Sequence, residues 1–170
     1  MLADTLHSDA RYLARILPQY RNGKHDDLDY RIARRDAHNA IAALSGLLGQ
    51  MLREPGGKHR HDDVLLRFLT AAQVLLGHLS TLGSHRQVLS TAAVNAVIER
   101  GDQAVAALQR VADAVLASEK PAIDPADIAA DGAEPSLPND DVATLVLNQL
   151  ALVRGQCRKL AELTAEWQPR

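Results

Sequence analysis

Aromatic side chains are scarce in this chain, whose 170 residues include three tyrosines, one tryptophan and one phenylalanine. The apolar share of 46% must therefore come mainly from leucine, alanine, valine and isoleucine. Because leucine and alanine are strong helix formers, this composition favours helices. Runs that alternate apolar and polar residues, which are typical of strands, are also missing from the sequence. We therefore predict an all-α protein.

Cysteine and net charge are both low. Cys157 is the only cysteine, so an internal disulfide is excluded, and a lone thiol suits a reducing compartment. On a helical face with no evident partner, Cys157 is expected to be a packing residue and not a nucleophile. The formal net charge is −2, whereas a dedicated nucleic-acid binder needs a strong positive field. We expect no nucleic-acid partner.

Long hydrophobic runs are lacking as well. The longest stretches without Asp, Glu, Lys or Arg are 37–52 and 68–85, and both are shorter than the ~20 strongly apolar residues of a membrane helix. Both are also diluted with polar residues, so they are predicted to be core helices. The first ten residues include Asp4, His7 and Asp9, which do not fit a secretory signal sequence. The chain is expected to be one soluble domain over 1–170.

Apolar residues recur at spacings of three and four along about five stretches, which predicts an up-and-down helical bundle. The expected helices span 2–20, 26–54, 62–83, 90–118 and 139–167. Pro18 should kink or stop the first, and Asp26 or Asp27 should cap the second. Gly101 leaves open whether the fourth is one long helix or two. The repeating face of the first stretch contains Leu2, Leu6, Asp9, Leu13, Ile16 and Tyr20.

The composition changes over 119–138, where four prolines stand among aspartate, alanine and glycine. Large apolar residues are few in this segment, so little burial can offset the entropy of ordering it. We predict a flexible loop with at most one helical turn over 125–130.

No catalytic constellation is recognisable in the sequence. A glycine-rich phosphate loop, a Ser-His-Asp arrangement and a pair of inward carboxylates are all missing, so neither an enzyme activity nor a cofactor is expected. Four histidines are the candidate metal ligands, namely His59, His61, His78 and His85. The first two follow Pro55-Gly56-Gly57 in a predicted connector, and no Glu-x-x-His pair accompanies them. His78 and His85 are better explained as hydrogen-bonding residues beside a helix seam, although a proton-sensitive pair is the alternative.

The densest polar cluster lies in the second predicted helix. Its candidate partner or ion-pair residues are Arg31, Arg34, Arg35, His38 and Asn39. Helical spacing turns Ala33, Ala37 and Ile41 inward. The residues that it places on or beside the solvent side are Arg31, Arg35, His38 and Asn39. Arg35 and Asn39 are four residues apart, so they could jointly hold an anion or a carboxylate. An ordinary solvated face is the alternative. If the arginines have fixed partners, the expected carboxylates are those of Glu99, Asp102 and Glu162.

The same stretch carries a resemblance to a known family. The segments concerned are Tyr30–Ser45 (YRIARRDAHNAIAALS), Met51–Gly56 (MLREPG), Phe68-Leu69 and Leu82–Arg86 (LGSHR). They resemble the YccS/YhfK group of bacterial inner-membrane proteins, which are relatives of the fusaric-acid-resistance and aromatic-acid efflux proteins. The resemblance covers roughly residues 20–86, and the rest of the chain matches only as generic helix.

The resemblance implies a C-terminal soluble domain on the cytoplasmic face of the inner membrane, following the membrane-spanning part of the same polypeptide. It would serve assembly, regulation or partner contact in a transporter-like protein, with self-association as a further expectation. The first helix would then continue a membrane helix upstream. It implies no catalytic residues. The rival hypothesis is a free-standing ligand- or metal-binding bundle.

Overall fold

Helices make up nearly all of the part of the chain that the computed structural model describes, namely residues 1–23, 27–53, 62–85, 87–121 and 141–167. The helices are α1 (Leu2–Ile16), α2 (Gln19–Asn22), α3 (Leu28–Met51), α4 (Asp62–Ser84), α5 (Thr91–Ala117) and α7 (Asp141–Trp167). These described segments contain no strand. The prediction of an all-α bundle is confirmed.

Local sequence explains where several helices begin and end. The Asp27 carboxylate accepts a hydrogen bond of 2.7 Å from the Tyr30 N–H and caps α3, while Ser90 caps α5 in the same way. α1 ends at Ile16, and Pro18 precedes the short α2, so the predicted interruption by Pro18 is confirmed. At the end of α5, Ser118 adopts a left-handed conformation with φ of 55°.

Gly101 does not break α5, which continues through it as one helix. A Cβ atom at this position would overlap the side chain of Leu17, which is itself buried. The glycine therefore allows the end of α1 to approach α5 closely.

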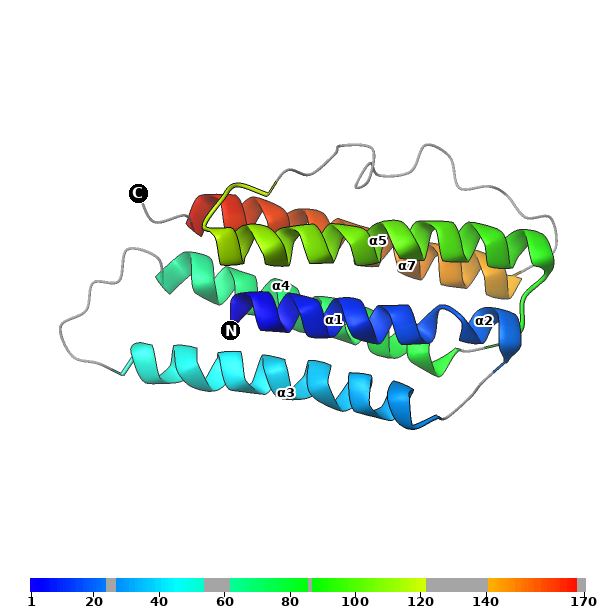
Figure 1. Cartoon of the computed structure of the whole chain (residues 1–170), viewed down its shortest axis with the longest axis horizontal. Helices are drawn as coiled ribbons and strands as arrows, with labels where there is room; N and C mark the ends of the chain where they lie inside the picture. The colour runs from blue at the N-terminus through cyan, green and yellow to red at the C-terminus, as the bar shows by residue number, and fades with distance from the viewer. Residues whose placement is uncertain (24–26, 54–61, 86, 122–140, 168–170) are drawn as a thin grey trace.

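Four helices form a ring in which α1 borders α5, α5 borders α7, α7 borders α4, and α4 borders α1 (Figure 1). The fifth long helix, α3, lies outside this ring against α1 and α4. Chain direction alternates from α1 through α3 and α4 to α5, as expected for an up-and-down bundle. α7 departs from this alternation and runs parallel to α5.

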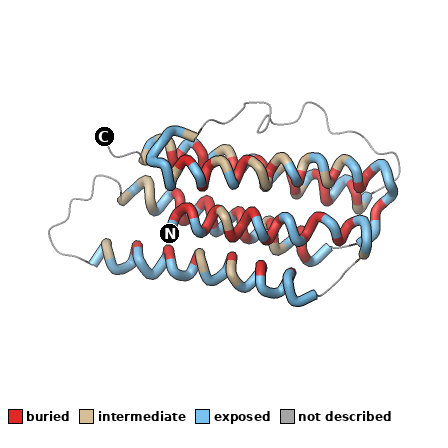
Figure 2. Tube along the Cα trace, in the orientation of Figure 1, coloured by how far each residue is buried: buried red, intermediate tan, exposed pale blue. Residues whose placement is uncertain are grey.

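The core lies around α1, and α3 is peripheral (Figure 2). Ten of the 15 residues of α1 are buried, compared with six of the 24 residues of α3. The buried stripe of α3 has the three- and four-residue spacing of a helix that contacts its neighbours along one narrow face. It consists of Tyr30, Ala33, Ala37, Ile41, Leu44 and Leu48.

Among the described helices, α4 alone is long and apolar enough to cross a membrane by length and composition. Its buried residues include Phe68, Leu75 and Leu79, which belong to the apolar core that all the long helices share. In this bundle α4 packs against α1, α3 and α7.

Three predicted features lie outside the described residues. They are most of the segment 119–138 with its turn over 125–130, the stop signal Pro55-Gly56-Gly57, and the histidines His59 and His61.

Candidate interaction site

The polar cluster on α3 points away from the bundle. All five residues predicted as contacts are exposed, namely Arg31, Arg34, Arg35, His38 and Asn39. Ala33, Ala37 and Ile41 are buried, so the assignment of the inner and outer faces of this helix is confirmed. The cluster lies in the N-terminal half of α3, on a helix face that no other described element covers.

Arg35 has its recorded partner on its own helix. Its Nη2 and Nε atoms donate hydrogen bonds of 2.8 and 3.1 Å to the same oxygen of Asp36. The Arg35 side chain is 66% exposed, so this pair contributes little to stability.

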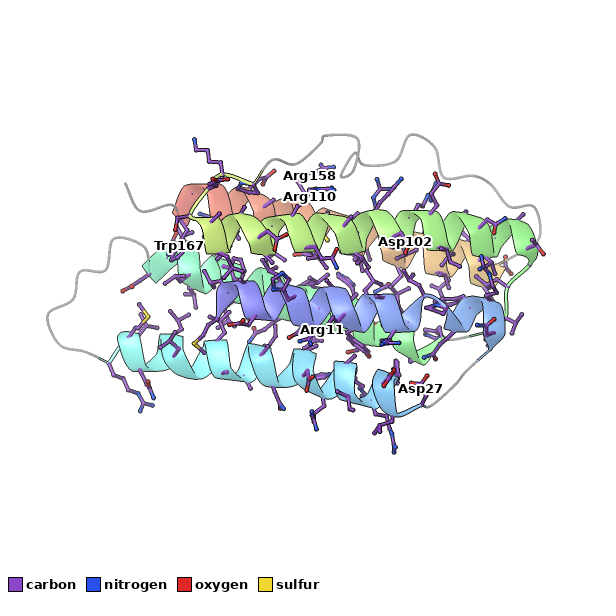
Figure 3. All side chains as sticks on the ribbon, in the orientation of Figure 1. Arg11, Asp27, Asp102, Arg110, Arg158 and Trp167 are labelled. Atoms are coloured by element: carbon purple, nitrogen blue, oxygen red, sulfur yellow. The ribbon has the colours of Figure 1, made fainter. Side chains whose placement is uncertain are left out.

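The expected partners Glu99, Asp102 and Glu162 are wrong. The first two lie on α5 and the third on α7, and within the described chain α3 borders neither of these helices. Figure 3 shows Asp102 on α5, on the opposite side of α1 from α3. The expectation failed because helical spacing shows which face of α3 is polar but not which helices lie beside it.

A groove of 410 Å³ with charged residues in both walls lies between α1 and α3, beside the predicted cluster. Arg11 and Arg15 line it from α1, and Asp29 and Asp36 line it from α3. Arg15 Nη2 lies 3.4 Å from Asp29 Oδ2, so part of this charge is already balanced across the groove. Sequence reasoning missed the groove because its two walls come from different helices. The available signal was the pair Asp29 and Asp36, seven residues apart on one face of α3.

All three tyrosines gather where α1, α2, α3 and α4 meet. The Tyr12 and Tyr30 hydroxyls are 3.3 Å apart, and the Tyr20 hydroxyl donates a 2.8 Å hydrogen bond to the Leu82 carbonyl. A Cβ atom on Gly83 would lie 2.7 Å from the Tyr30 hydroxyl and 2.9 Å from that of Tyr12. Burial is the main cause of a raised pKa at Tyr12, and the hydrogen bond with the Tyr30 hydroxyl adds to it, so the Tyr12 hydroxyl keeps its proton at physiological pH. This tyrosine cluster holds the inner face of α3 against the bundle. The outer face of α3 is therefore turned toward solvent.

The two histidines in and just after α4, His78 and His85, have different surroundings. His78 is partly buried, and the Gln149 Nε2 atom of α7 lies 2.8 Å from its Nδ1 atom. Burial lowers the pKa of His78, which favours the neutral ring. His85 is exposed. The interpretation of His78 as a hydrogen-bonding residue at a helix seam is confirmed. The described segments bring no three histidine, cysteine or acidic side chains together as a metal site.

A buried acid and a buried thiol lie near one another inside the bundle. Asp9 is fully buried on α1, and neither carboxyl oxygen has a hydrogen-bond partner among the described residues. Burial raises the pKa of Asp9 well above its usual value. Burial and the nearby Asp9 raise the pKa of Cys157 to about 12, so the thiol remains protonated, as expected of a packing residue.

These features define a helical bundle that leaves an arginine-rich helix face and an adjoining charged groove open to solvent. Over 99 residues, 58% of this chain, it is 35% identical to the "Inner membrane protein YccS" of Escherichia coli. It is also 44% identical over 81 residues to an uncharacterized protein of Haemophilus influenzae. A third relative, "Uncharacterized protein ORF2" of Neisseria gonorrhoeae, is 38% identical over 77 residues.

The matched segments are short parts of these relatives. They span 14% of the Escherichia coli protein, 11% of the Haemophilus protein and 18% of the Neisseria protein. No family model and no solved structure matches the chain. The chain is thus similar, over about half its length, to a segment of an inner-membrane protein.

Proposed function

We propose that this chain is a domain of a transporter-like inner-membrane protein, located on the cytoplasmic face, and that the outer face of α3 is its contact surface. The observation that carries this proposal is the exposure of α3. The helix is held by one narrow buried stripe, and its outer face presents three arginines, a histidine and an asparagine within nine residues. Guanidinium groups form specific bidentate pairs with carboxylates, so such a face is suited to an acidic partner surface.

The similarity to the inner-membrane protein of Escherichia coli supports a membrane context for this surface. In the proposed arrangement, the membrane-spanning part of the same polypeptide or a second copy of the domain contacts α3. The domain acts through binding, in assembly or regulation, and has neither a catalytic role nor a cofactor. Among the described residues, no observation favours the rival metal-binding function.

Site-specific photocrosslinking tests the contact surface. A photoreactive residue replaces His38 on α3, in the native full-length protein in bacterial inner-membrane vesicles. The matched control replaces Asn148, an exposed polar residue on α7. Crosslinks are expected from position 38 and not from position 148, and the double variant Arg31→Glu and Arg35→Glu should abolish them.

The mass of the crosslinked product distinguishes a second copy from an intramolecular contact with the membrane part. Equal crosslinking from both positions, or none from position 38, contradicts the proposal.

A further inference from the structure

Five helices converge around an apolar cavity at the end of the bundle where α1 begins and α3, α5 and α7 end. The cavity has a volume of 360 Å³. Leu44 and Leu47 line it from α3, Leu65 from α4 and Val115 from α5. Figure 3 labels Trp167 at this end of the bundle, in the last turn of α7.

The walls of the cavity have a distinctive composition. The chain contains two methionines and one tryptophan, and all three line this cavity, as Met1, Met51 and Trp167. Methionine side chains adapt to differently shaped ligands and make favourable contacts with aromatic rings. Tryptophan offers a large flat surface for stacking.

The charge of the cavity walls restricts which ligands can bind there. Among the described residues, no lysine, arginine, histidine or acidic side chain lines the cavity, and the α-amino group of Met1 is already paired with the Asp4 carboxylate at 2.8 Å. A charged ligand would lose its hydration there without gaining a compensating side-chain partner, whereas an apolar ligand gains from leaving water.

The volume of the cavity restricts the size of the ligand. Small-molecule sites occupy about 300–1,000 Å³, and an apolar cavity of about 150 Å³ is enough to bind benzene. At 360 Å³ this cavity is more than twice as large as a benzene site. It therefore fits two to three aromatic rings.

We propose that this cavity is a binding site for an uncharged aromatic molecule of two to three rings. The site is at the end of the bundle and is separate from the arginine cluster on α3. This inference does not rest on the proposed contact function, and the two can fail independently.

A pair of dyes with the same ring system tests the size and the charge of the ligand. N-phenyl-1-naphthylamine is uncharged, and 8-anilino-1-naphthalenesulfonate is its sulfonated analogue. Because Trp167 is the only tryptophan, excitation of its indole and energy transfer to the dye report binding. The uncharged dye is expected to bind saturably with one site per chain, and the sulfonate about tenfold more weakly or worse because its charge must be desolvated.

Two lysine substitutions at exposed leucines locate the dye. Leu47 is 39% exposed and lines the cavity, whereas Leu152, on α7, is 50% exposed and does not. Leu47→Lys should weaken binding of the uncharged dye about tenfold or more, and Leu152→Lys should leave it unchanged. Circular dichroism melts of both variants establish that each is folded before binding is measured.

Three outcomes overturn the proposal. The first is the absence of saturable binding by the parent chain. The second is equal affinity for the two dyes, and the third is equal loss of binding in both lysine variants.

Neutral phosphatidylcholine vesicles form a further arm of the experiment. If the chain co-sediments with the vesicles in a Leu47-dependent manner and does not bind the dye, the cavity is a membrane contact and not a ligand site.

Discussion

At the scale of single residues, the carboxyl group of Asp9 is an unfavourable part of the core. Its carboxyl group is fully buried without a recorded hydrogen-bond partner, and the nearby Cys157 is a protonated thiol that supplies no positive charge. A buried carboxylate without compensation is costly, so the group retains its proton in the folded state.

This raised pKa predicts how stability depends on pH. The unfolded chain releases the Asp9 proton above a pH of about 3.9, whereas the folded chain retains it until a higher pH. The contribution of Asp9 to the free energy of unfolding should therefore fall as pH rises through this window, by up to about 1.4 kcal/mol per pH unit. Asp9→Asn should remove this slope. Urea unfolding at pH 5 and pH 8 measures the free energy of unfolding of the parent and the variant. The same change between the two pH values in both proteins would contradict the prediction.

The arginines of α3 are expected to matter for contact and not for stability. Arg31 and Arg35 are exposed, and the recorded ion pair of Arg35 is with its neighbour Asp36. Arg31→Ala and Arg35→Ala should each change the free energy of unfolding by less than about 0.5 kcal/mol. Ile41→Ala, on the buried face of the same helix, should cost about 2–4 kcal/mol. Thermal melts compare the three, and a large loss in either arginine variant would indicate a fixed intramolecular partner.

At the scale of helices, two glycines in helix interiors have opposite roles. A Cβ atom on Gly46, in the exposed part of α3, would meet nothing within 4 Å. Gly46→Ala should therefore raise the free energy of unfolding by up to about 1 kcal/mol, because alanine favours the helix. Gly101→Ala in α5 should lower it by about 1–3 kcal/mol, because its Cβ overlaps the buried Leu17 side chain.

Urea unfolding measures both variants, and a double-mutant cycle identifies the cause. If the clash with Leu17 is responsible, Gly101→Ala should be less harmful in a Leu17→Ala background. Independent, additive losses would show that the close approach of α1 to α5 is not the reason for the glycine.

At the scale of the whole molecule, stability is expected to come from the shared apolar core, without a metal ion. Buried residues of α1, α3, α4, α5 and α7 form one continuous cluster. The melting temperature should therefore be the same with and without a chelator. A decrease of more than about 5 °C, equivalent to roughly 1 kcal/mol in a domain of this size, would favour the metal-binding hypothesis. Circular dichroism melts provide the measurement.

Much of the secondary structure could be predicted from the sequence, because helix formation depends on residues close in the chain. The three- and four-residue spacing located the long helices, Asp27 was one of the two predicted caps of α3, and Pro18 interrupts the first helix. The same spacing placed Arg31 and Arg35 on the outer face of α3.

The packing of these helices depends on residues far apart in the chain, so only the tertiary structure could reveal it. The structure places α3 against α1 and α4, which excludes Glu99 and Asp102 as partners of the α3 arginines. The structure also shows that α7 runs parallel to α5. Asp9 was visible within an apolar stripe, but its full burial depends on the helices that surround α1. The cavity beside Trp167 likewise exists only where five helix ends meet. Spacing within one helix determines which face is apolar, whereas the neighbour of that face is determined by how all the helices jointly bury their apolar surfaces.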